Sequence, residues 1–194
     1  YVSESISAFV QVGISQQGFK RIDYFNYLDS DPERETDWQN IVGGNIKGGV
    51  NWNINQKSNV YVNMGDYSKQ PFFDAVFQNY RNDINPNPRN EKVSGFELGY
   101  GYVSNNFTAN LNLYRTQWRD RFLTVSYEDE NENQGTADLQ GIEQLHMGVE
   151  LDLTYDITDN FRLVGMASIG DWEYAGDVSG TAFDNNATPI GTAN

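Results

Sequence analysis

Residues 144–155 read QLHMGVELDLTY, and this stretch decides the fold. Its odd-numbered positions, from Leu145 to Tyr155, are all apolar or aromatic. Its even-numbered positions, from Gln144 to Thr154, are polar, charged or glycine. Because successive side chains of a β-strand point to opposite faces, a period of two is typical of a strand with one apolar and one polar face. The stretch is therefore predicted to be one long β-strand.

The same alternation recurs along the chain, and helical spacing competes with it nowhere over a comparable length. The longest of these alternating runs span roughly 10–12 residues, which is about as long as a tilted strand must be to cross a bilayer. These runs predict an all-β chain with about seven strands. They lie at residues 5–15, 44–54, 60–64, 96–102, 107–113, 144–155 and 161–169.

The connections between these runs fall into two classes. Short turns are expected at 55–59, 104–106 and 156–160, and long polar stretches lie near 17–43, 69–92 and 128–139. Short turns at one end and long loops at the other are typical of outer-membrane barrels. We therefore predict an antiparallel up-and-down transmembrane β-barrel, of which this chain is a partial set of strands.

Aromatic residues near the short turns support the barrel. They fall on the apolar face, and Tyr and Trp favour the membrane–water interface, where the ring is apolar and one polar atom stays wet. We expect a girdle at the short-turn rim made of Trp52, Tyr100, Tyr102, Phe107, Tyr155 and Phe161. The opposite face carries many polar residues, which predicts a barrel filled by another part of the protein, and Gly95, Gly99 and Gly101 on this face are expected to permit close approach of another backbone.

Composition excludes several classes of function. The chain has 13 basic and 27 acidic residues and a net charge of −14, which argues against a nucleic-acid partner. It has no cysteine and a single histidine, His146, so thiolate sites are excluded and histidine-based catalysis has little to work with. A mean hydropathy of −0.64 agrees with the lack of an apolar run long enough for a spanning helix. We expect no cofactor and no catalytic residue, and hence no enzyme.

One long connection has an unusual content of phenylalanine. Phe72, Phe73 and Phe77 either seal the barrel mouth with apolar side chains or form an aromatic wall of a substrate path. Trp172 and Tyr174, at the extracellular end of the last predicted strand, are weaker candidates for ligand stacking.

An acidic stretch in the first long connection is the remaining candidate site. Asp29, Asp31 and Glu33 lack the spacing of a helix-loop-helix calcium loop. A solvated loop is the favoured interpretation, with an irregular Ca²⁺ site as the alternative.

Three segments, 45–77, 91–122 and 140–174, resemble the barrel region of TonB-dependent outer-membrane receptors, above all those of Bacteroidetes-type bacteria. The phrases that carry the likeness are EKVSGFELGY (91–100), QGIE (140–143) and GDW (170–172). The resemblance implies a barrel of about 22 strands occluded by an N-terminal plug. It also implies TonB-coupled uptake of a scarce nutrient such as a siderophore, a vitamin, an oligosaccharide or a peptide.

Residues 1–194 contain no recognisable plug domain or TonB box, and Asn194 is not the terminal aromatic residue of a complete barrel. We therefore expect part of one receptor barrel domain, truncated at both ends, in a bacterial outer membrane. The expected partners are outer-membrane lipid, the receptor's own plug and TonB through it, a surface lipoprotein and the nutrient. The alternative is a secreted or surface-exposed β-sandwich that binds glycans, whose apolar faces would pack against a second sheet.

Overall fold

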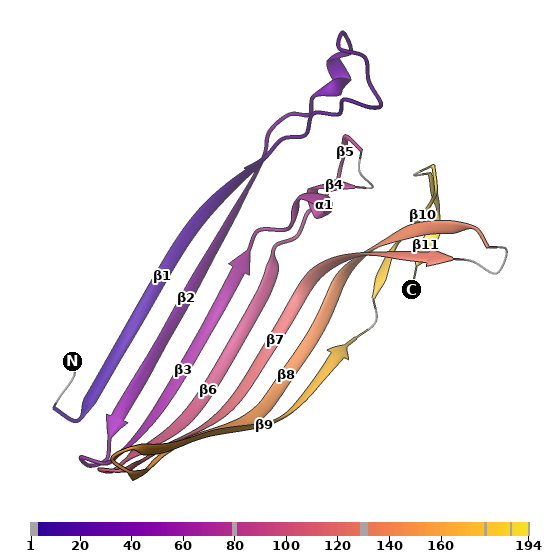
Figure 1. The fold of residues 1–194 in the computed structure, drawn as a ribbon. Coiled ribbons are helices and arrows are strands. Elements are labelled where there is room, and N and C mark those ends of the chain that lie inside the picture. The colour runs from indigo at the N-terminus through magenta and orange to yellow at the C-terminus, as the bar shows by residue number, and fades with distance from the viewer. Residues whose placement is uncertain (1–3, 79–80, 129–131, 177, 187, 194) are drawn as a thin grey trace.

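The computed structural model describes residues 4–193 except 79–80, 129–131, 177 and 187. Nearly all of it is antiparallel β-structure, organised as one nine-stranded sheet and a separate two-stranded hairpin (Figure 1). The all-β prediction is confirmed. The long strands are β1 (Ile6–Phe19), β2 (Gln39–Asn53), β3 (Ser58–Lys69), β6 (Glu91–Val103), β7 (Phe107–Glu128), β8 (Gln134–Thr158) and β9 (Phe161–Ala175).

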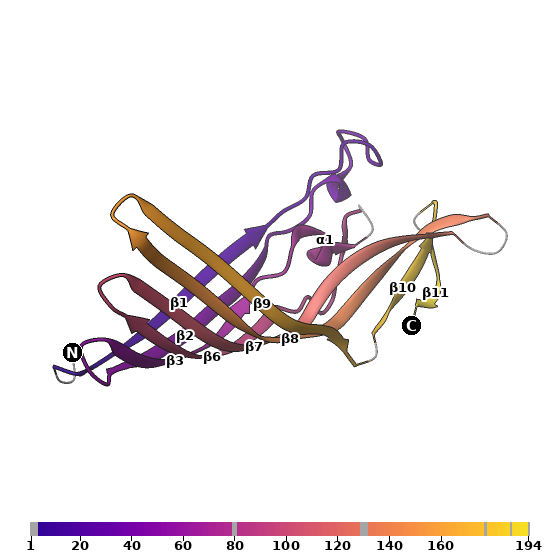
Figure 2. The ribbon, with the colours of Figure 1, turned by 60° about the horizontal axis from the view of Figure 1, so that its bottom comes forward.

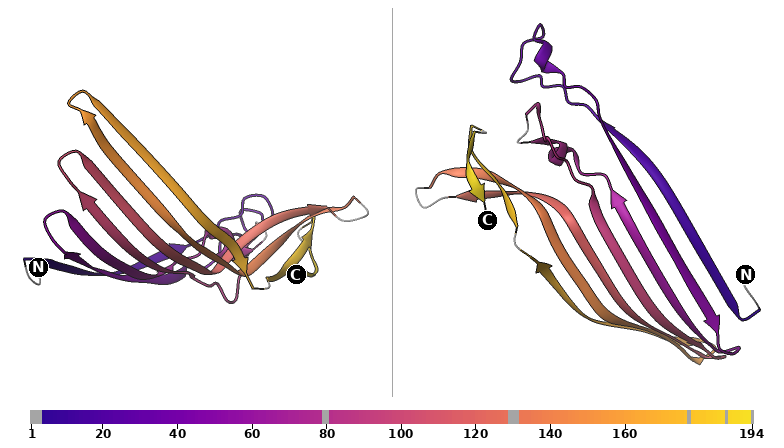
Figure 3. Two further views of the ribbon diagram at one scale, coloured as in Figure 1. Left: turned by 90° about the horizontal axis from the view of Figure 1, so that it is seen from below. Right: turned by 180° about the vertical axis from the view of Figure 1, so that it is seen from behind.

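The sheet is an up-and-down meander. Along it the order is β1-β2-β3-β6-β7-β8, with β9 paired to β8, and every pairing is antiparallel. The sheet is curved and open, as Figures 2 and 3 show, and its outer strands β1 and β9 are not paired with each other in the described part of the chain. This is the architecture of part of a β-barrel.

The strand register aligns the predicted faces across all seven long strands. One line of hydrogen-bonding partners carries an apolar residue on every strand, and the line beside it is mostly polar. Since directly paired residues share a face, one face is apolar and the other polar. The apolar line is Ala8, Val50, Val62, Leu98, Leu113, Val149 and Ile169. The adjacent line is Ser7, Asn51, Tyr61, Gly99, Asn112, Glu150 and Ser168.

The six aromatic residues expected in a girdle all lie on the apolar face near the short turns. They do not follow one register line but step obliquely, from Trp52 on β2 to Tyr155 on β8 and Phe161 on β9. From each strand to the next, the aromatic position shifts by about one residue relative to the register. If the aromatic residues lie at one depth in the membrane, this shift corresponds to a strand tilt of about 40°. A tilt of that size is typical of transmembrane barrels.

The two classes of connection lie at opposite ends of the sheet. The short turns join β2 to β3, β6 to β7 and β8 to β9 at the lower end in Figure 1, and the longer connections lie at the upper end. We call the upper end the loop end. Its smaller elements are η1 (Pro32–Arg34), α1 (Phe73–Val76), β4 (Phe77–Gln78), β5 (Asp83–Ile84), β10 (Ser179–Asp184) and β11 (Pro189–Ala193). In the described residues, no helix has the length and apolarity to cross a membrane.

The prediction of a long loop near 128–139 is wrong over most of that stretch. β7 continues to Glu128 and β8 begins at Gln134, so most of the described part of this stretch is strand. The charged and polar residues suggested a loop, but a strand that extends into water does not need an apolar face. Above Glu143, the last β8 residue paired with β9, the hairpin of β10 and β11 continues the sheet along β8.

Buried side chains gather at the loop end rather than along the sheet. Phe19, Val76 and Phe77 form the core cluster, with Ile41 packed against it. The apolar face is left uncovered instead: Ile14 on β1 is 83% exposed and Ile169 on β9 is 80% exposed. No second sheet covers this face in the described part of the chain, so the sandwich alternative is not favoured.

Candidate functional site: the polar face and the loop end

The hollows along the long strands lie mainly on the polar face of the sheet. One of about 530 Å³ is lined on that face by Lys47, Asn63, Glu97, Tyr114 and Glu150. A barrel wall is concave on its inner side, so the polar face is the inner face and the apolar face is the outer one. The side chains of Lys47 and Glu150 form no hydrogen bond or ion pair with the described residues, so they are available to another part of the protein that lies against this wall.

Large side chains on the inner face lie across glycines of neighbouring strands. Tyr61 on β3 donates its phenol hydrogen to the amide oxygen of Asn112 on β7, across Gly99 of β6. A Cβ at Gly99 would collide with the Tyr61 ring, and one at Gly101 would collide with Asn59. The expectation that these two glycines admit another backbone is therefore wrong.

Trp172 belongs to the inner face, where it meets two other side chains. Its indole Nε1 donates to the Tyr114 hydroxyl at 3.0 Å, and its ring centroid lies 5.9 Å from that of His146. Tyr174 pairs with Gln144 and lies on the same face. Both aromatic residues are exposed, so they are open to a solute inside the barrel. Tyr114 was not anticipated, because only the register brings β7 and β9 together over β8.

Phe72 and Phe73 lie at the loop end and line a hollow of about 520 Å³ together with Trp38. Lys69 places its ammonium 3.9 Å from the centre of the Phe72 ring, and Lys20 also lines the hollow. Both lysines are paired with carboxylates, Lys69 with Glu91 at 2.9 Å and Lys20 with Glu35 at 2.5 Å, so the hollow offers mainly aromatic walls, which suit a solute with flat apolar parts. Sequence reasoning missed Trp38, whose only signal was a lone tryptophan at the end of a polar stretch.

Phe77 is separated from that hollow by its burial. Its side chain is 1% exposed, in the core with Phe19 and Val76, and its ring centroid lies 4.9 Å from that of Phe73. Asn85 stabilises the same loop by donating its side-chain amide to the Ala75 carbonyl at 2.8 Å. In this arrangement Phe77 holds the loop, while Phe72 and Phe73 remain the candidates for ligand contact. The five predicted aromatic residues do not form one site, because Trp172 and Tyr174 belong to β9.

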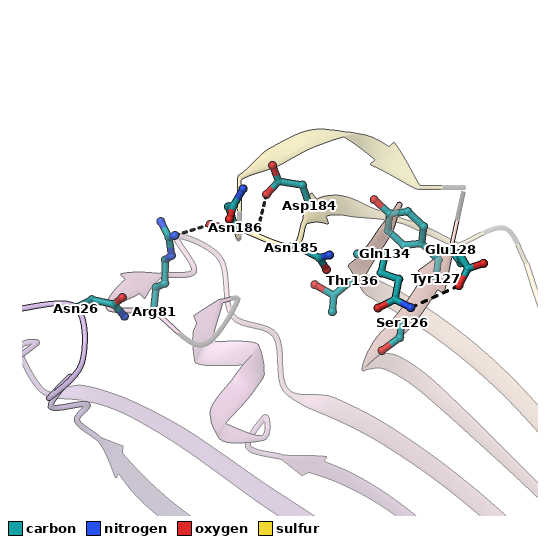
Figure 4. A pocket seen from close by; sticks show the side chains of 11 residues that line it. Asn26, Arg81, Ser126, Tyr127, Glu128, Gln134, Thr136, Asp184, Asn185 and Asn186 are labelled. Carbon is teal, nitrogen blue, oxygen red and sulfur yellow. Dashed lines mark hydrogen bonds between the residues drawn. The ribbon is translucent and has the colours of Figure 1, made fainter. Parts of the chain in front are cut away.

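A second loop-end hollow, of about 870 Å³, has a polar lining (Figure 4). Its wall includes Tyr127 and Thr136 from the tips of β7 and β8, and Arg81 from the β4–β5 connection. Arg81 donates to the Asn186 carbonyl at 2.5 Å, which ties this connection to the turn between β10 and β11. Amide, hydroxyl and guanidinium groups of this kind suit a solute rich in hydrogen-bonding groups.

The acidic residues of the first long connection are engaged in local contacts. Asp29 pairs with Arg34 at 2.6 Å, and Asp31 accepts the Leu28 amide at 2.9 Å. Nowhere in the described residues do three or more His, Cys, Asp or Glu side chains come close enough to hold a metal ion. Asp29, Asp31 and Glu33 are therefore not assembled as a Ca²⁺ site in this structure.

Two aspartates at the loop end have opposite pKa shifts. Hydrogen bonds from the side chain and backbone of Asn26 and from the backbone of Phe25 lower the pKa of Asp23 to about 2. Burial raises the pKa of Asp138 on the extension of β8, while the Thr124 hydroxyl donates to one of its oxygens at 2.7 Å. The Asp23 carboxylate thus stabilises its turn, whereas burial disfavours the charged form of Asp138.

Comparison with known proteins supports the fold and goes no further. The strand order, register and curvature define the class, which is part of an antiparallel β-barrel. No family model matches the sequence, and no curated protein matches it either. Among solved structures the chain is similar to the copper transporter OprC, with a TM-score of 0.68 and 13% identity over the whole of this chain. The match takes up 35% of the OprC chain, so this chain spans about a third of that length.

Proposed function

We propose that this chain forms part of the wall of an outer-membrane β-barrel that takes up a nutrient. The observation that carries the proposal is the outer face, which is apolar in register across seven strands and uncovered by the rest of the described chain. Uncovered apolar surface of this extent is unfavourable in water but suits lipid. The backbones of the interior strands β2, β3, β6, β7 and β8 are satisfied by cross-strand hydrogen bonds over the span of the band, as hydrocarbon requires, and in the proposed barrel further strands pair with the edges at β1 and β9.

The finer assignment is a TonB-dependent receptor. It is supported by the resemblance of residues 45–77, 91–122 and 140–174 to the barrels of such receptors. The likeness to Bacteroidetes-type receptors rests only on the sequence of these segments. In this assignment the inner face, with Lys47 and Glu150, meets the receptor's own plug domain. Energy arrives from TonB through that plug, and a surface lipoprotein helps to deliver the nutrient at the loop end.

The solute is proposed to be captured at the loop end and passed along the inner face. The aromatic hollow beside Phe72 and the polar hollow beside Tyr127 are the two capture surfaces. They fit a siderophore, a vitamin, an oligosaccharide or a peptide. Copper, which the name of OprC gives as its cargo, is not proposed here, since His146 faces inward while its neighbour Met147 faces outward. We propose no catalytic role for any residue.

The proposal is tested by membrane fractionation of cells that express the full-length protein carrying this chain. We expect the protein in the outer-membrane fraction, extractable only with detergent, and a migration on gels that changes on heating, as folded barrels show. A water-soluble, monodisperse protein would overturn the proposal in favour of the β-sandwich. Uptake is then measured with cells lacking TonB as the control.

A further inference from the structure

Basic residues gather on the outer face at the loop-end border of the apolar band. On β7, Arg115 follows Leu111 and Leu113 on this face, and its register partners are Phe96 and Met147. Further toward the loop end, Lys92 on β6 pairs with Arg119 on β7, and Arg89 comes just before β6. We call these four residues the basic patch: Arg89, Lys92, Arg115 and Arg119.

The basic patch has fewer counter-ions than cations. Arg89 and Lys92 share one carboxylate, that of Asp120, at 3.2 and 3.4 Å. Arg119 donates one N–H to the Ser94 hydroxyl at 3.0 Å, while its Nε is buried without a hydrogen-bond partner in the described structure. Arg115 is exposed and has no hydrogen bond or ion pair within the described residues.

Other carboxylates on the same face lie outside the basic patch: Asp171 and Glu173 are on β9, two strands away from Arg115, and two more are engaged with neutral side chains. Asp66 accepts the Ser94 hydroxyl at 2.7 Å, and Glu143 lies 3.5 Å from the Gln117 amide. On and next to β6 and β7, four cations face one ion-paired carboxylate, that of Asp120, so the basic patch keeps a local excess of positive charge within a chain whose net charge is −14. Overall composition does not account for this concentration of cations.

The position of the patch identifies what can neutralise it, on the proposed function that this sheet lies in a membrane. Arg115 is the first outward residue of β7 beyond Leu113, so its guanidinium lies where hydrocarbon ends. An unpaired charge there is costly unless it reaches polar headgroups. Among the headgroup components, phosphate is the anion that arginine binds in bidentate fashion.

We propose that the basic patch binds the phosphate group of an anionic lipid in the leaflet on the loop side. Arg115 and Arg119 bind phosphate oxygens from β7, and Lys92 adds a cation from β6. Beside them Arg89, Asn90, Lys92 and Asp120 line a hollow of about 330 Å³ that receives the remainder of the headgroup. The acyl chains lie along the apolar band toward Leu111 and Leu113.

The test uses the full-length protein in non-ionic detergent, titrated with short-chain phosphatidic acid and followed by native mass spectrometry. The variant is Arg115→Gln with Arg119→Gln, and the matched control is Lys57→Gln with Arg162→Gln, which removes the same charge at the short-turn end of the sheet. We expect the arginine variant to bind phosphatidic acid about 30-fold more weakly, since each basic residue near a membrane surface contributes a factor of about five. The control and Arg115→Lys, which keeps the charge, should bind within a few-fold of the wild type.

Equal binding by the arginine variant and the wild type would overturn the proposal, as would an equal loss in the control. Phosphatidylcholine of the same chain length should bind much more weakly than phosphatidic acid. If inorganic phosphate displaces the lipid at equal concentration, the site is one for free phosphate and the lipid assignment is wrong. Membrane flotation of the wild type separates this result from the proposed function: a protein that floats but shows no preference for phosphate contradicts only the lipid site.

Discussion

Trp172 on β9 donates its indole N–H to the Tyr114 hydroxyl on β7 at 3.0 Å, although β8 lies between their strands. The contact is possible because the residues under the Tyr114 side chain are Gly148 and Gly170. A Cβ at either glycine would approach the Tyr114 oxygen to 2.7 or 2.8 Å. The Tyr114 side chain thus covers part of the inner face, and it has room to do so because Gly148 and Gly170 have no side chains.

Replacing Gly148 by alanine is expected to destabilise the sheet. The new methyl group would lie 2.6 Å from the Ile169 carbonyl oxygen and 2.7 Å from the Tyr114 hydroxyl, so backbone as well as side chain must shift. Overpacking of this kind costs about 1–3 kcal/mol. The urea midpoint of the protein in lipid vesicles should fall, whereas Gly165→Ala, with nothing within 4 Å of its Cβ, should leave it nearly unchanged. Equal midpoints for the two variants would contradict the packing described here.

A charge on the outer face should be far more costly than a charge on the inner face. Leu111 and Asn110 are neighbours on β7 that point to opposite faces in the middle of the apolar band. Leu111→Arg should lower the free energy of unfolding in lipid by about 2–4 kcal/mol, the cost of arginine near a bilayer midplane. Asn110→Arg should cost much less. The measurement is unfolding in phosphatidylcholine vesicles, and the reverse order of costs would mean that the faces are assigned the wrong way round.

The loop between β3 and β6 should depend on Phe77 and not on Phe72. Phe77 is 1% exposed and Phe72 is 56% exposed. Truncating a buried phenylalanine costs about 3–5 kcal/mol, which is enough to open a loop while the strands remain folded. Limited proteolysis should cut Phe77→Ala within residues 70–90 and spare Phe72→Ala. If both resist cleavage equally, the small core does not hold the loop.

Acid should release the turn that Asp23 organises. Hydrogen bonds hold the folded pKa of Asp23 at about 2, below the ordinary value of 3.8, so the ionised carboxylate stabilises the turn. That stabilisation is fully present above about pH 4 and is lost as the pH falls toward 2. The Asn26 amide, which donates to Asp23 at 2.9 Å, should lose its protection from hydrogen exchange over this range. In Asp23→Asn the acid step should be absent; a step that persists would point to another group.

Asp138 should show the opposite dependence. Burial raises its folded pKa, so the folded state binds a proton more tightly than the unfolded state does, and the contribution to stability falls as the pH rises. Asp138→Asn should therefore raise the midpoint of thermal unfolding at pH 8 and change it less near pH 4. A variant that is less stable than the wild type at pH 8 would show that the charged carboxylate is the favoured form.

The sequence predicted the strands better than it predicted the surfaces at their ends. A period of two is a local signal, so the faces of residues 144–155 could be assigned without knowing what lies beside them. The Tyr61 ring covers Gly99, and Trp172 contacts Tyr114. Both contacts depend on the cross-strand register, which the sequence of a single strand does not encode. Phe77 and Phe72 look alike in sequence, and their different exposure follows from the short helix α1 between them. The strand tips near Glu128 and Gln134 were missed because strands in water lose the alternation that marks them.

The length of β8 has a consequence for how a solute would enter. With 25 residues, the strand has a contour of about 80 Å, against about 30 Å of hydrocarbon in a bilayer. The loop-end parts of β7 and β8 extend beyond the apolar band and carry the polar hollow beside Tyr127 away from it, into water. Under the proposed function, a solute bound in this hollow would be held there before it meets the membrane surface. On that proposal, capture and passage would then be separated by distance, and each could change in evolution without altering the other.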